Sequence, residues 1–371
     1  MEKAKISAYQ LFVLIVLFEI GSALLVPLAI EAKQDAWLAI LLGMTGGFFI
    51  FFMYHRLYLY YPDCLPTTYV QKIIGKFCGR ILAFLYMIYF LYLAARVLRD
   101  FGEVLAVIAY PVTPITLNHA FLVLVVIYTV RKGIEVLART GELFFVLIYL
   151  LAISGFILLL VSGLIDLNNL KPMLEEGLSP VIKVAFTQSL FFPFGEAVVF
   201  AMILPYLNNP KKAKIIGLSA LGLSGINLAI SMTVNIGVLG VSQVLRTQFP
   251  LLSTIQMIQL AEFLERLDIF FMLAVIVLGF FKISLFFYAA VIGTADLFHI
   301  KKPSQLAFPI GFVLLFLSII IASNIMEHFR EGLQIVPVYL HLPFQIILPL
   351  LLLIIAFFKN RKKRGQGKPS T

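Results

Sequence analysis

Apolar residues along this chain occur in ten long runs, which short polar segments separate. A helix needs about 20 mostly apolar residues to cross the hydrocarbon of a bilayer, and each run is close to that length or longer. The pattern therefore predicts an all-α polytopic membrane protein, with a single transmembrane domain over residues 1–371 and little sequence left for a soluble domain. The predicted spans are approximately 8–31, 36–55, 80–110, 115–131, 141–165, 186–207, 213–241, 267–295, 305–325 and 337–358.

Composition and charge agree with a membrane protein. Hydrophobic residues make up 61% of the chain and charged residues 13%, which is outside the range of soluble domains. The net charge of +10 does not indicate nucleic acid as a partner, because most lysines and arginines fall on one side when the N-terminus is placed in the cytoplasm. We therefore expect both termini in the cytoplasm. The basic tail, residues 359–371, is expected to rest on the anionic headgroups of the lipid bilayer, with a docking role as the alternative.

The sequence offers no pattern for metal or thiol chemistry. Cys64 and Cys78 fall in one predicted cytoplasmic segment, where a disulfide is not expected. The five histidines are scattered near span ends, and no pair has the spacing of metal ligands. The motifs H-E-x-x-H and G-x-S-x-G and the Walker loop are also absent. We therefore expect no metal, no cofactor and no enzymatic activity.

The ten spans divide into two halves of five, and corresponding features occur in each half. The first span contains FEIGSALLVP and the sixth contains FFPFGEAVVF. A short amphipathic stretch, YPDCLPTTYVQKIIGKF, precedes the third span, and QFPLLSTIQMIQLAEFL precedes the eighth on the opposite side of the membrane. An odd number of spans per half inverts the second half. These features predict a 5+5 inverted repeat, with residues 1–165 as the first half and 186–358 as the second.

The first and sixth spans are each interrupted by residues that break helices. Pro193 and Gly195 lie in the sixth span, and Gly-Ser-Ala lies at 21–23 in the first. A break frees main-chain N–H and C=O groups that hydrocarbon cannot satisfy, whereas the carboxylate and ammonium of a small ligand can. Each break also has a carboxylate beside it, Glu19 or Glu196. We therefore expect a ligand site at mid-membrane rather than two ordinary proline kinks.

The eighth span carries an isolated cation, Lys282, at its middle, where a charge is costly. In transporters with repeats of this type, the sodium-coupled ones hold an ion beside this span. Lys282 would supply a permanent positive charge there, or it would form a structural ion pair with Glu196 or Glu19. Glu196 could receive a ligand ammonium, carry a coupled proton, or pair with a neighbour. Ser284 and Tyr288, on one face of the same span, suit a pocket wall, and ordinary helix packing is the alternative.

The third span contains two potential ion pairs. Arg99 and Glu103 are four residues apart, as are Arg96 and Asp100. Side chains at this spacing meet on the surface of a helix. We expect both pairs to neutralise themselves near the outer end of the span, and a gate is the alternative.

The second span contains a G-x-x-x-G pattern at Gly43 and Gly47. Small residues at this spacing let helices approach closely. We expect this face to pack inside the bundle, and a dimer contact is the alternative.

Four stretches carry a resemblance to a known family, and they are KISAYQLFVLIVLFEIGSALLVP, LRDFGEVL, DLNNLKPMLEEGLSPV and FPFGEAVVFAMILPYL. They resemble the B-subunit family of spore nutrient germinant receptors, a branch of the amino acid–polyamine–organocation transporter superfamily. The resemblance runs nearly end to end and implies ten spans in the inverted-repeat fold of LeuT-like transporters. It also implies a sensor in the inner membrane of endospores of a Gram-positive bacterium, in complex with an A subunit and a C subunit that is a lipoprotein. Such a B subunit is thought to bind a germinant, typically a small amino acid, after which ions leave the spore core.

The resemblance also implies a ligand pocket at the two breaks. Its candidate residues are Gly21, Ser22 and Ala23 of the first break, Phe192, Phe194, Gly195 and Glu196 of the second, Ser284 and Tyr288 of the eighth span, and Tyr89 and Leu93 of the third. Tyr89 and Leu93 are placed by their distance from Arg99 and not by a motif. Gly-Ser-Ala stands where many superfamily members have a more glycine-rich first break, so the size of the pocket and the ligand stay open.

Two functions fit these features. A receptor would sense a nutrient in a transporter-like pocket, and a proton-coupled amino-acid permease would carry it across the membrane. Both need the same broken helices, so the physical argument does not separate them. The family resemblance favours the receptor.

Overall fold

The computed structural model describes residues 4–258 and 267–366. These residues form no extended strand, and an isolated parallel bridge joins Ile6 to Leu207. Among the residues described, seven helices are long and apolar enough to cross a membrane, or eight if a pair of helices joined by a bend counts as one span, and two further apolar helices are shorter. Each of them coincides with one of the ten predicted runs. The prediction of an all-α polytopic fold is therefore confirmed.

The first half of the chain contains five spans and one short helix. Its elements are α1 (Ala8–Ile20), η1 (Ser22–Leu24), η2 (Ile30–Asp35), α2 (Ala36–Tyr60), α3 (Pro66–Ile74), α4 (Lys76–Ile108), α5 (Ile115–Arg131) and α6 (Ile134–Ser162). After a loop with η3 (Leu167–Leu170), the sixth span consists of α7 (Leu178–Val184), η4 (Ala185–Ser189), η5 (Phe194–Met202) and η6 (Leu204–Tyr206).

The remaining elements form the seventh to tenth spans. They are η7 (Pro210–Lys212), α8 (Ala213–Leu239), α9 (Val241–Arg246), α10 (Pro250–Gln256), α11 (Asp268–Leu297), η9 (Pro303–Gln305), α12 (Ala307–Ile320), α13 (Ile325–Arg330), η10 (Glu331–Ile335), η11 (Pro337–Ile347) and α14 (Leu348–Gln366). The segments named η are 3-10 helices, except that η4, η10 and η11 are π-helices.

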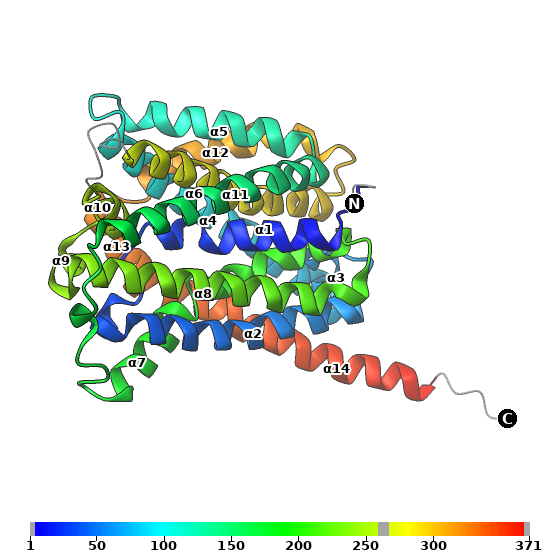
Figure 1. Ribbon diagram of the computed structural model, residues 1–371. Helices are drawn as coiled ribbons and strands as arrows, with labels where there is room; N and C mark the ends of the chain where they lie inside the picture. The colour runs from blue at the N-terminus through cyan, green and yellow to red at the C-terminus, as the bar shows by residue number, and fades with distance from the viewer. Residues whose placement is uncertain (1–3, 259–266, 367–371) are drawn as a thin grey trace.

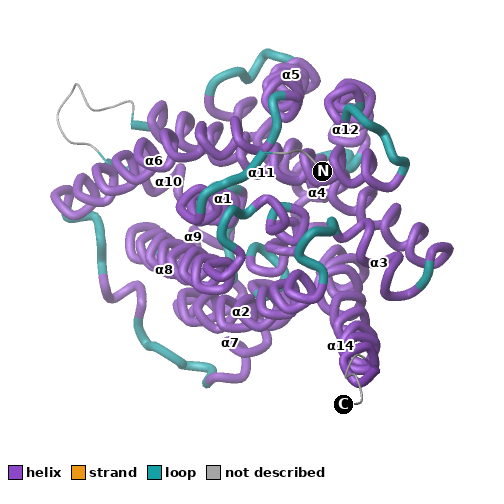
Figure 2. The backbone as a smooth tube through the Cα atoms, turned by 90° about the vertical axis from the view of Figure 1, so that its right-hand side faces the viewer, coloured by secondary structure: helices purple, strands orange, loops and turns teal. Residues whose placement is uncertain are grey.

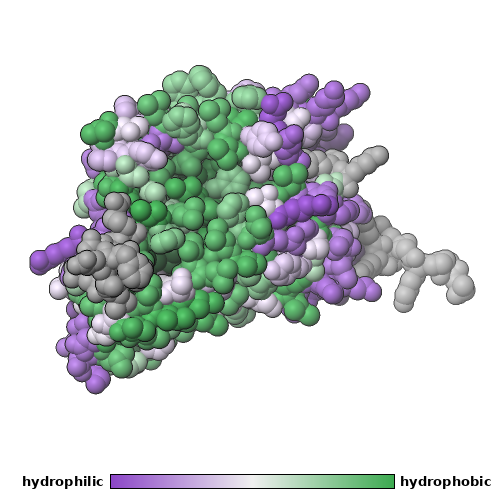
Figure 3. Space-filling model, turned by 45° about the horizontal axis from the view of Figure 1, so that its top comes forward, coloured by the Kyte–Doolittle hydropathy of each residue, from purple (hydrophilic) through white to green (hydrophobic). Residues whose placement is uncertain are grey.

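The long helices run roughly parallel in one bundle (Figure 1). The end-on view places α1 inside the bundle, whereas α5 and α12 lie at its edge (Figure 2). The helix α1 packs against α6, α8 and α11, which explains why every residue from Val13 to Ile20 is buried. On the face that Figure 3 shows, a broad apolar band lies between two polar ends. A band of this kind suits the hydrocarbon of a bilayer, and the protein is an integral membrane protein.

The inversion of the two halves is visible in the two short amphipathic helices. α3 and α10 each begin with a proline in the first turn, where its missing N–H costs no hydrogen bond. They lie at opposite ends of the bundle (Figure 1), as the predicted 5+5 repeat requires. Residues 259–264 of the stretch that was expected to form the second helix lie outside the described residues.

The G-x-x-x-G face of α2 packs inside the bundle against the sixth span. A Cβ atom added at Gly43 would overlap the side chain of Ser189, and one added at Gly47 would lie 2.6 Å from the Cβ of Phe194. Real Cβ atoms do not approach other atoms as closely as these two added Cβ atoms would approach the side chains of Ser189 and Phe194. Glycine is therefore required because the two spans touch here, and the packing interpretation is confirmed.

Two predicted spans differ from the structure. The ninth is not a straight helix over 305–325, because α12 ends at Ile320 and the chain turns by 104° into residues 325–335. The side chain of Asn324 caps the new helix by accepting from the N–H of Glu327. The tenth helix continues past 358 as far as Gln366, so the expected tail begins as helix, and residues 367–371 lie outside the described residues.

Candidate functional site

The first span is broken where it was predicted to be. α1 ends at Ile20, and the N–H of Gly21 makes the last bond of this helix, to the carbonyl of Leu17 at 3.2 Å. A Cβ at Gly21 would lie 2.7 Å from both the carbonyl oxygen of Phe18 and the Cδ of Lys282. Glycine is needed here because the side chain of Lys282 crosses directly over the break.

The second break interrupts the sixth span. After η4 the N–H of Phe192 bonds to the carbonyl of Gln188 at 3.0 Å, and the chain then turns into η5. Pro193 causes the turn, because proline has no N–H and disfavours helix in the residue before it. η5 is a 3-10 helix of nine residues, unusually long for this geometry, which often marks a functional hinge.

The two breaks meet at Lys282 of α11. Its Nζ lies 2.6 Å from Oε2 of Glu196 and 4.9 Å from the ring centres of both Phe18 and Phe192. The Lys282 side chain is completely buried. The contact with Glu196 is a buried ion pair between an ammonium and a carboxylate. One ammonium therefore joins α1, the sixth span and α11, and it is further stabilised by two aromatic faces.

Several polar atoms at the breaks have no hydrogen-bond partner. Both carboxylate oxygens of Glu19 and the hydroxyls of Ser22 and Ser189 are buried and unpartnered. Lys282 and Glu196 are the charged groups that act on Glu19. Unsatisfied buried polar atoms are uncommon in folded proteins and require an explanation. A small polar ligand would satisfy them.

Sequence reasoning missed the contribution of the tenth span. Gln345 on η11 lies over Gly195, and its Nε2 donates to the hydroxyl of Tyr89 at 2.9 Å. The same hydroxyl lies 2.7 Å from Nδ1 of His341. The Oε1 of Gln345 is buried without a partner. The available signal was a His and a Gln four residues apart in an apolar run, which places both on one face of a helix.

Tyr89 of the third span is linked to the second break through Gln345, which bonds to its hydroxyl and lies over Gly195. Leu93 is buried one turn further along α4, and Ala23 is buried beside Ser22. Phe194 instead packs on Gly47 of α2, away from Lys282.

Ser284 and Tyr288 do not join the breaks. Ser284 is two residues from Lys282 on α11, so it points about 200° around the helix from it. The Tyr288 ring packs against Tyr206, near the end of the sixth span, with ring centres 6.2 Å apart. The ring contact of Tyr288 fits ordinary helix packing, whereas the hydroxyl of Ser284 is buried without a hydrogen-bond partner.

The charges of the third span form a buried cluster with residues 325–335. Arg99 pairs with Glu103 at 2.8 Å, as predicted. The predicted pair of Arg96 with Asp100 is wrong. Arg96 donates to the carbonyl of His328 and lies 3.7 Å from Glu331, whereas Asp100 lies 2.7 Å from Nε2 of His328. These partners come from the bent ninth span, and the cluster closes the end of the bundle at which α13 lies.

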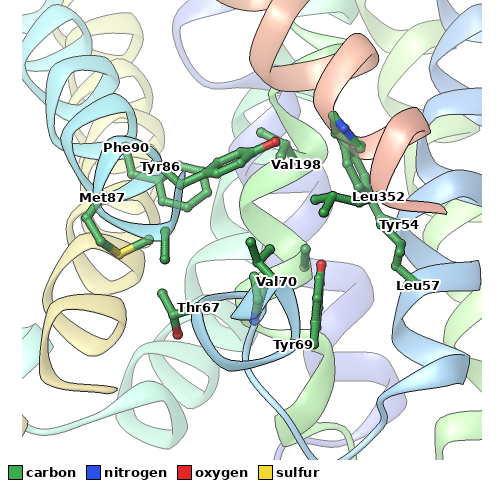
Figure 4. Close-up of a pocket in the computed structure, with 14 residues that line it drawn as sticks. Tyr54, Leu57, Thr67, Tyr69, Val70, Tyr86, Met87, Phe90, Val198 and Leu352 are labelled. Carbon is green, nitrogen blue, oxygen red and sulfur yellow. The ribbon is translucent and has the colours of Figure 1, made fainter. Parts of the chain in front are cut away.

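A cavity is lined partly by α3 (Figure 4), which lies at the end of the bundle opposite α13 (Figure 1). Its volume is about 30 Å³, enough for about two water molecules and too small for an amino acid. The lining side chains come from α2, α3, α4, η5 and α14, and include Tyr54, Thr67, Tyr69, Tyr86, Met87 and Val198. The space between the breaks is filled by Lys282 and the two phenyl rings.

The site is closed at both ends in this conformation. At one end, the N–H of Ile6 bonds to the carbonyl of Tyr206 at 2.9 Å, and the hydroxyl of Thr68 donates to Asp296 at 2.7 Å. At the other end, Asp35 accepts from the N–H of Leu174 at 3.0 Å. Main-chain and side-chain bonds of this kind must open before a ligand can enter.

The arrangement can bind a small zwitterion if Lys282 withdraws, because it presents one ammonium and two carboxyl groups beside unpartnered hydroxyl and amide groups. Within residues 4–258 and 267–366, no three His, Cys, Asp or Glu side chains come together as a metal site requires.

Comparisons with known proteins agree with this geometry. The profile of the family described as "Spore germination protein" (Spore_permease) matches residues 5–326. Spore germination protein KB of Bacillus subtilis (strain 168) is 53% identical over 369 residues, which cover 99% of both chains. Spore germination protein A2 of the same organism is 26% identical over 328 residues, covering 85% of this chain and 86% of its own.

Two solved structures share the fold. MhsT, crystallised in complex with L-phenylalanine, has a TM-score of 0.66 and 13% identity, and the match covers 96% of this chain and 99% of MhsT. Mhp1, a nucleobase-cation-symport-1 family transporter with bromovinylhydantoin bound, has a TM-score of 0.66 and 12% identity, covering 89% of this chain and 75% of Mhp1. Identity this low shows the LeuT-like fold alone. From the family match and the relative at 53% identity, we conclude that this chain belongs to the spore germination protein family, the B-subunit family of spore germinant receptors.

Proposed function

We propose that this chain is the membrane subunit of a spore germinant receptor and that it binds a small nutrient, an amino acid, between the breaks of its first and sixth spans. The observation that carries the proposal is the buried Lys282–Glu196 pair at 2.6 Å, which lies where both interruptions meet. A carboxylate and an ammonium held at mid-membrane complement the ammonium and the carboxylate of an amino acid. The crystal structure of MhsT with L-phenylalanine supports this class of ligand.

Binding requires Lys282 to move, because its side chain covers Gly21. The ligand carboxylate would replace Glu196 as the ion-pair partner of Lys282. The ligand ammonium would then pair with Glu196 and with Oε1 of Gln345. The direct contact between Lys282 of α11 and Glu196 of the sixth span would be lost, and the ligand would bridge the two residues instead. A ligand that binds one arrangement more tightly shifts the equilibrium toward it, and we propose this shift as the signal for germination.

The partners of this subunit are proposed from the family. They are the receptor A subunit and the C lipoprotein subunit, in the inner membrane of the endospore, with both termini on the core side. Two observations support this orientation. The start of α1 and the end of α14 lie at the same end of the bundle (Figure 1), and that end carries most of the basic loops.

Enlarging Ala23 is expected to change which nutrient triggers germination. Ala23 is 2% exposed beside the first break, so Ala23→Leu fills part of the space that a ligand needs. The measurement is a germinant screen on spores that carry the variant. Ala152→Leu is the control, since Ala152 is exposed on the lipid side of α6. An unchanged nutrient profile in folded Ala23→Leu protein would exclude this position from the site.

The alternative function is a proton-coupled amino-acid permease. The fold that this chain shares with MhsT and Mhp1 favours it, and a site closed at both ends is what alternating access passes through. Uptake of radiolabelled amino acids into proteoliposomes separates the two. Robust uptake by the isolated chain supports the permease, whereas binding without uptake, together with loss of germination on deletion, supports the receptor.

A further inference from the structure

Glu19 is an unusual buried carboxyl group. It is 0% exposed, and neither of its oxygens has a hydrogen-bond partner. It also lies in the last turn of α1, where the helix dipole opposes a negative charge. An isolated ionised carboxylate in such a place is very costly, and the group is expected to neutralise itself instead.

The neighbours of Glu19 provide one positive charge for two carboxyl groups. Lys282 of α11 and Glu196 of η5 are the charged groups that act on it. The charged groups of the other long helices packed against α1 have different places or partners. The only ionisable residue of α8 is Lys214, in its first turn. In α6, Glu142 bonds to Gln10, nine residues before Glu19, and Arg139 pairs with Glu135. Because Nζ of Lys282 lies 2.6 Å from Glu196, its charge is already matched.

We infer that Glu19 is a proton-binding site, and that its proton and the ammonium of Lys282 can exchange between the two carboxyl groups. In the described conformation Lys282 pairs with Glu196 and the proton is on Glu19, so the buried cluster is neutral. In the exchanged form Lys282 pairs with Glu19 and the proton is on Glu196. The exchange therefore determines whether Lys282 links α11 to the first span, through Glu19, or to the sixth span, through Glu196. The inference goes beyond the proposed function and needs no particular nutrient.

The exchange predicts a specific set of infrared spectra. A protonated carboxylic acid has a carbonyl stretching band that an ionised carboxylate lacks, and exposed carboxylates are ionised at neutral pH. Spectra of the purified full chain are compared at neutral pH. The wild type is expected to show one such band, and Glu19→Gln removes it. Glu196→Gln also removes it, because Lys282 then pairs with Glu19, which ionises. Lys282→Met roughly doubles the band, because both carboxyl groups then hold protons.

A merely structural role for Glu19 would not produce this pattern. Glu31→Gln is the control, since Glu31 is exposed on η2 and its replacement should leave the band unchanged. Circular dichroism and size-exclusion chromatography show which variants are folded, and the two glutamine variants suffice if Lys282→Met does not fold. A band that survives in Glu19→Gln overturns the proton site. A band that survives in Glu196→Gln overturns the exchange. Neither result depends on a nutrient, so failure of the proton site would leave the proposed nutrient-binding function untouched, and the reverse also holds.

Discussion

Spores that carry Gly195→Ala are expected to lose their response to the nutrient. A Cβ at this position would overlap Oε1 of Gln345 and lie 2.9 Å from the carbonyl oxygen of Leu190. The Gln345 side chain can move, but the carbonyl belongs to the main chain at the second break. Overpacking of this kind typically costs about 1–3 kcal/mol, and here it displaces groups on both sides of the proposed ligand site. Germination rate and thermal unfolding of the purified chain measure the two effects.

Two further variants test the cause of this loss. Gly155→Ala is the matched control, because nothing lies within 4 Å of a Cβ at Gly155 on α6, and it should behave as the wild type. Adding Gln345→Ala to Gly195→Ala removes the side-chain overlap and should restore part of the stability. A normal response in the single variant would show that Gly195 is not in contact with the site.

Lys282→Met is expected to have the largest effect on stability. The substitution leaves Glu196 without its ammonium in a fully buried place, and breaking a buried ion pair by removing one partner costs about 3–5 kcal/mol. It should also abolish the nutrient response, because the proposed ligand carboxylate loses its partner. The free energy of unfolding in detergent and the germination rate are the measurements.

The double variant Lys282→Met with Glu196→Gln separates charge from packing. Removing both charges leaves neither unpaired, so it should recover much of the stability that Lys282→Met loses, but not the response. Lys214→Met is the control, because Lys214 is exposed in the first turn of α8. A stable Lys282→Met protein would contradict the importance of the pair.

The same variant tests whether Lys282 replaces a coupling cation. If its ammonium stands where a sodium ion would bind, Lys282→Met should make the nutrient response depend on sodium. The pair with Glu196 is compatible with both interpretations. A response that keeps its size and stays independent of sodium would exclude this role.

The sequence alone determined the features that depend on local chemistry. Runs of apolar residues locate the spans, because a helix needs about 20 mostly apolar residues to cross the hydrocarbon of a bilayer. Gly21 and Pro193 mark the breaks, because glycine weakens a helix and proline interrupts it. The Arg99–Glu103 pair follows from spacing on one helix.

Only the tertiary structure decided which distant groups meet. Arg96 and Asp100 have the spacing of a pair, but residues 325–335 offer them other partners, and the turn after α12 that brings these residues close leaves no periodic signal. Gln345 reaches Gly195 through the packing of the tenth span. The sequence left Glu19 and Glu196 as alternative partners of Lys282. The pairing with Glu196 depends on how α11 packs against the sixth span, which residue spacing does not reveal. Burial makes that choice matter, because an unpaired charge without water is far more costly than one at the surface.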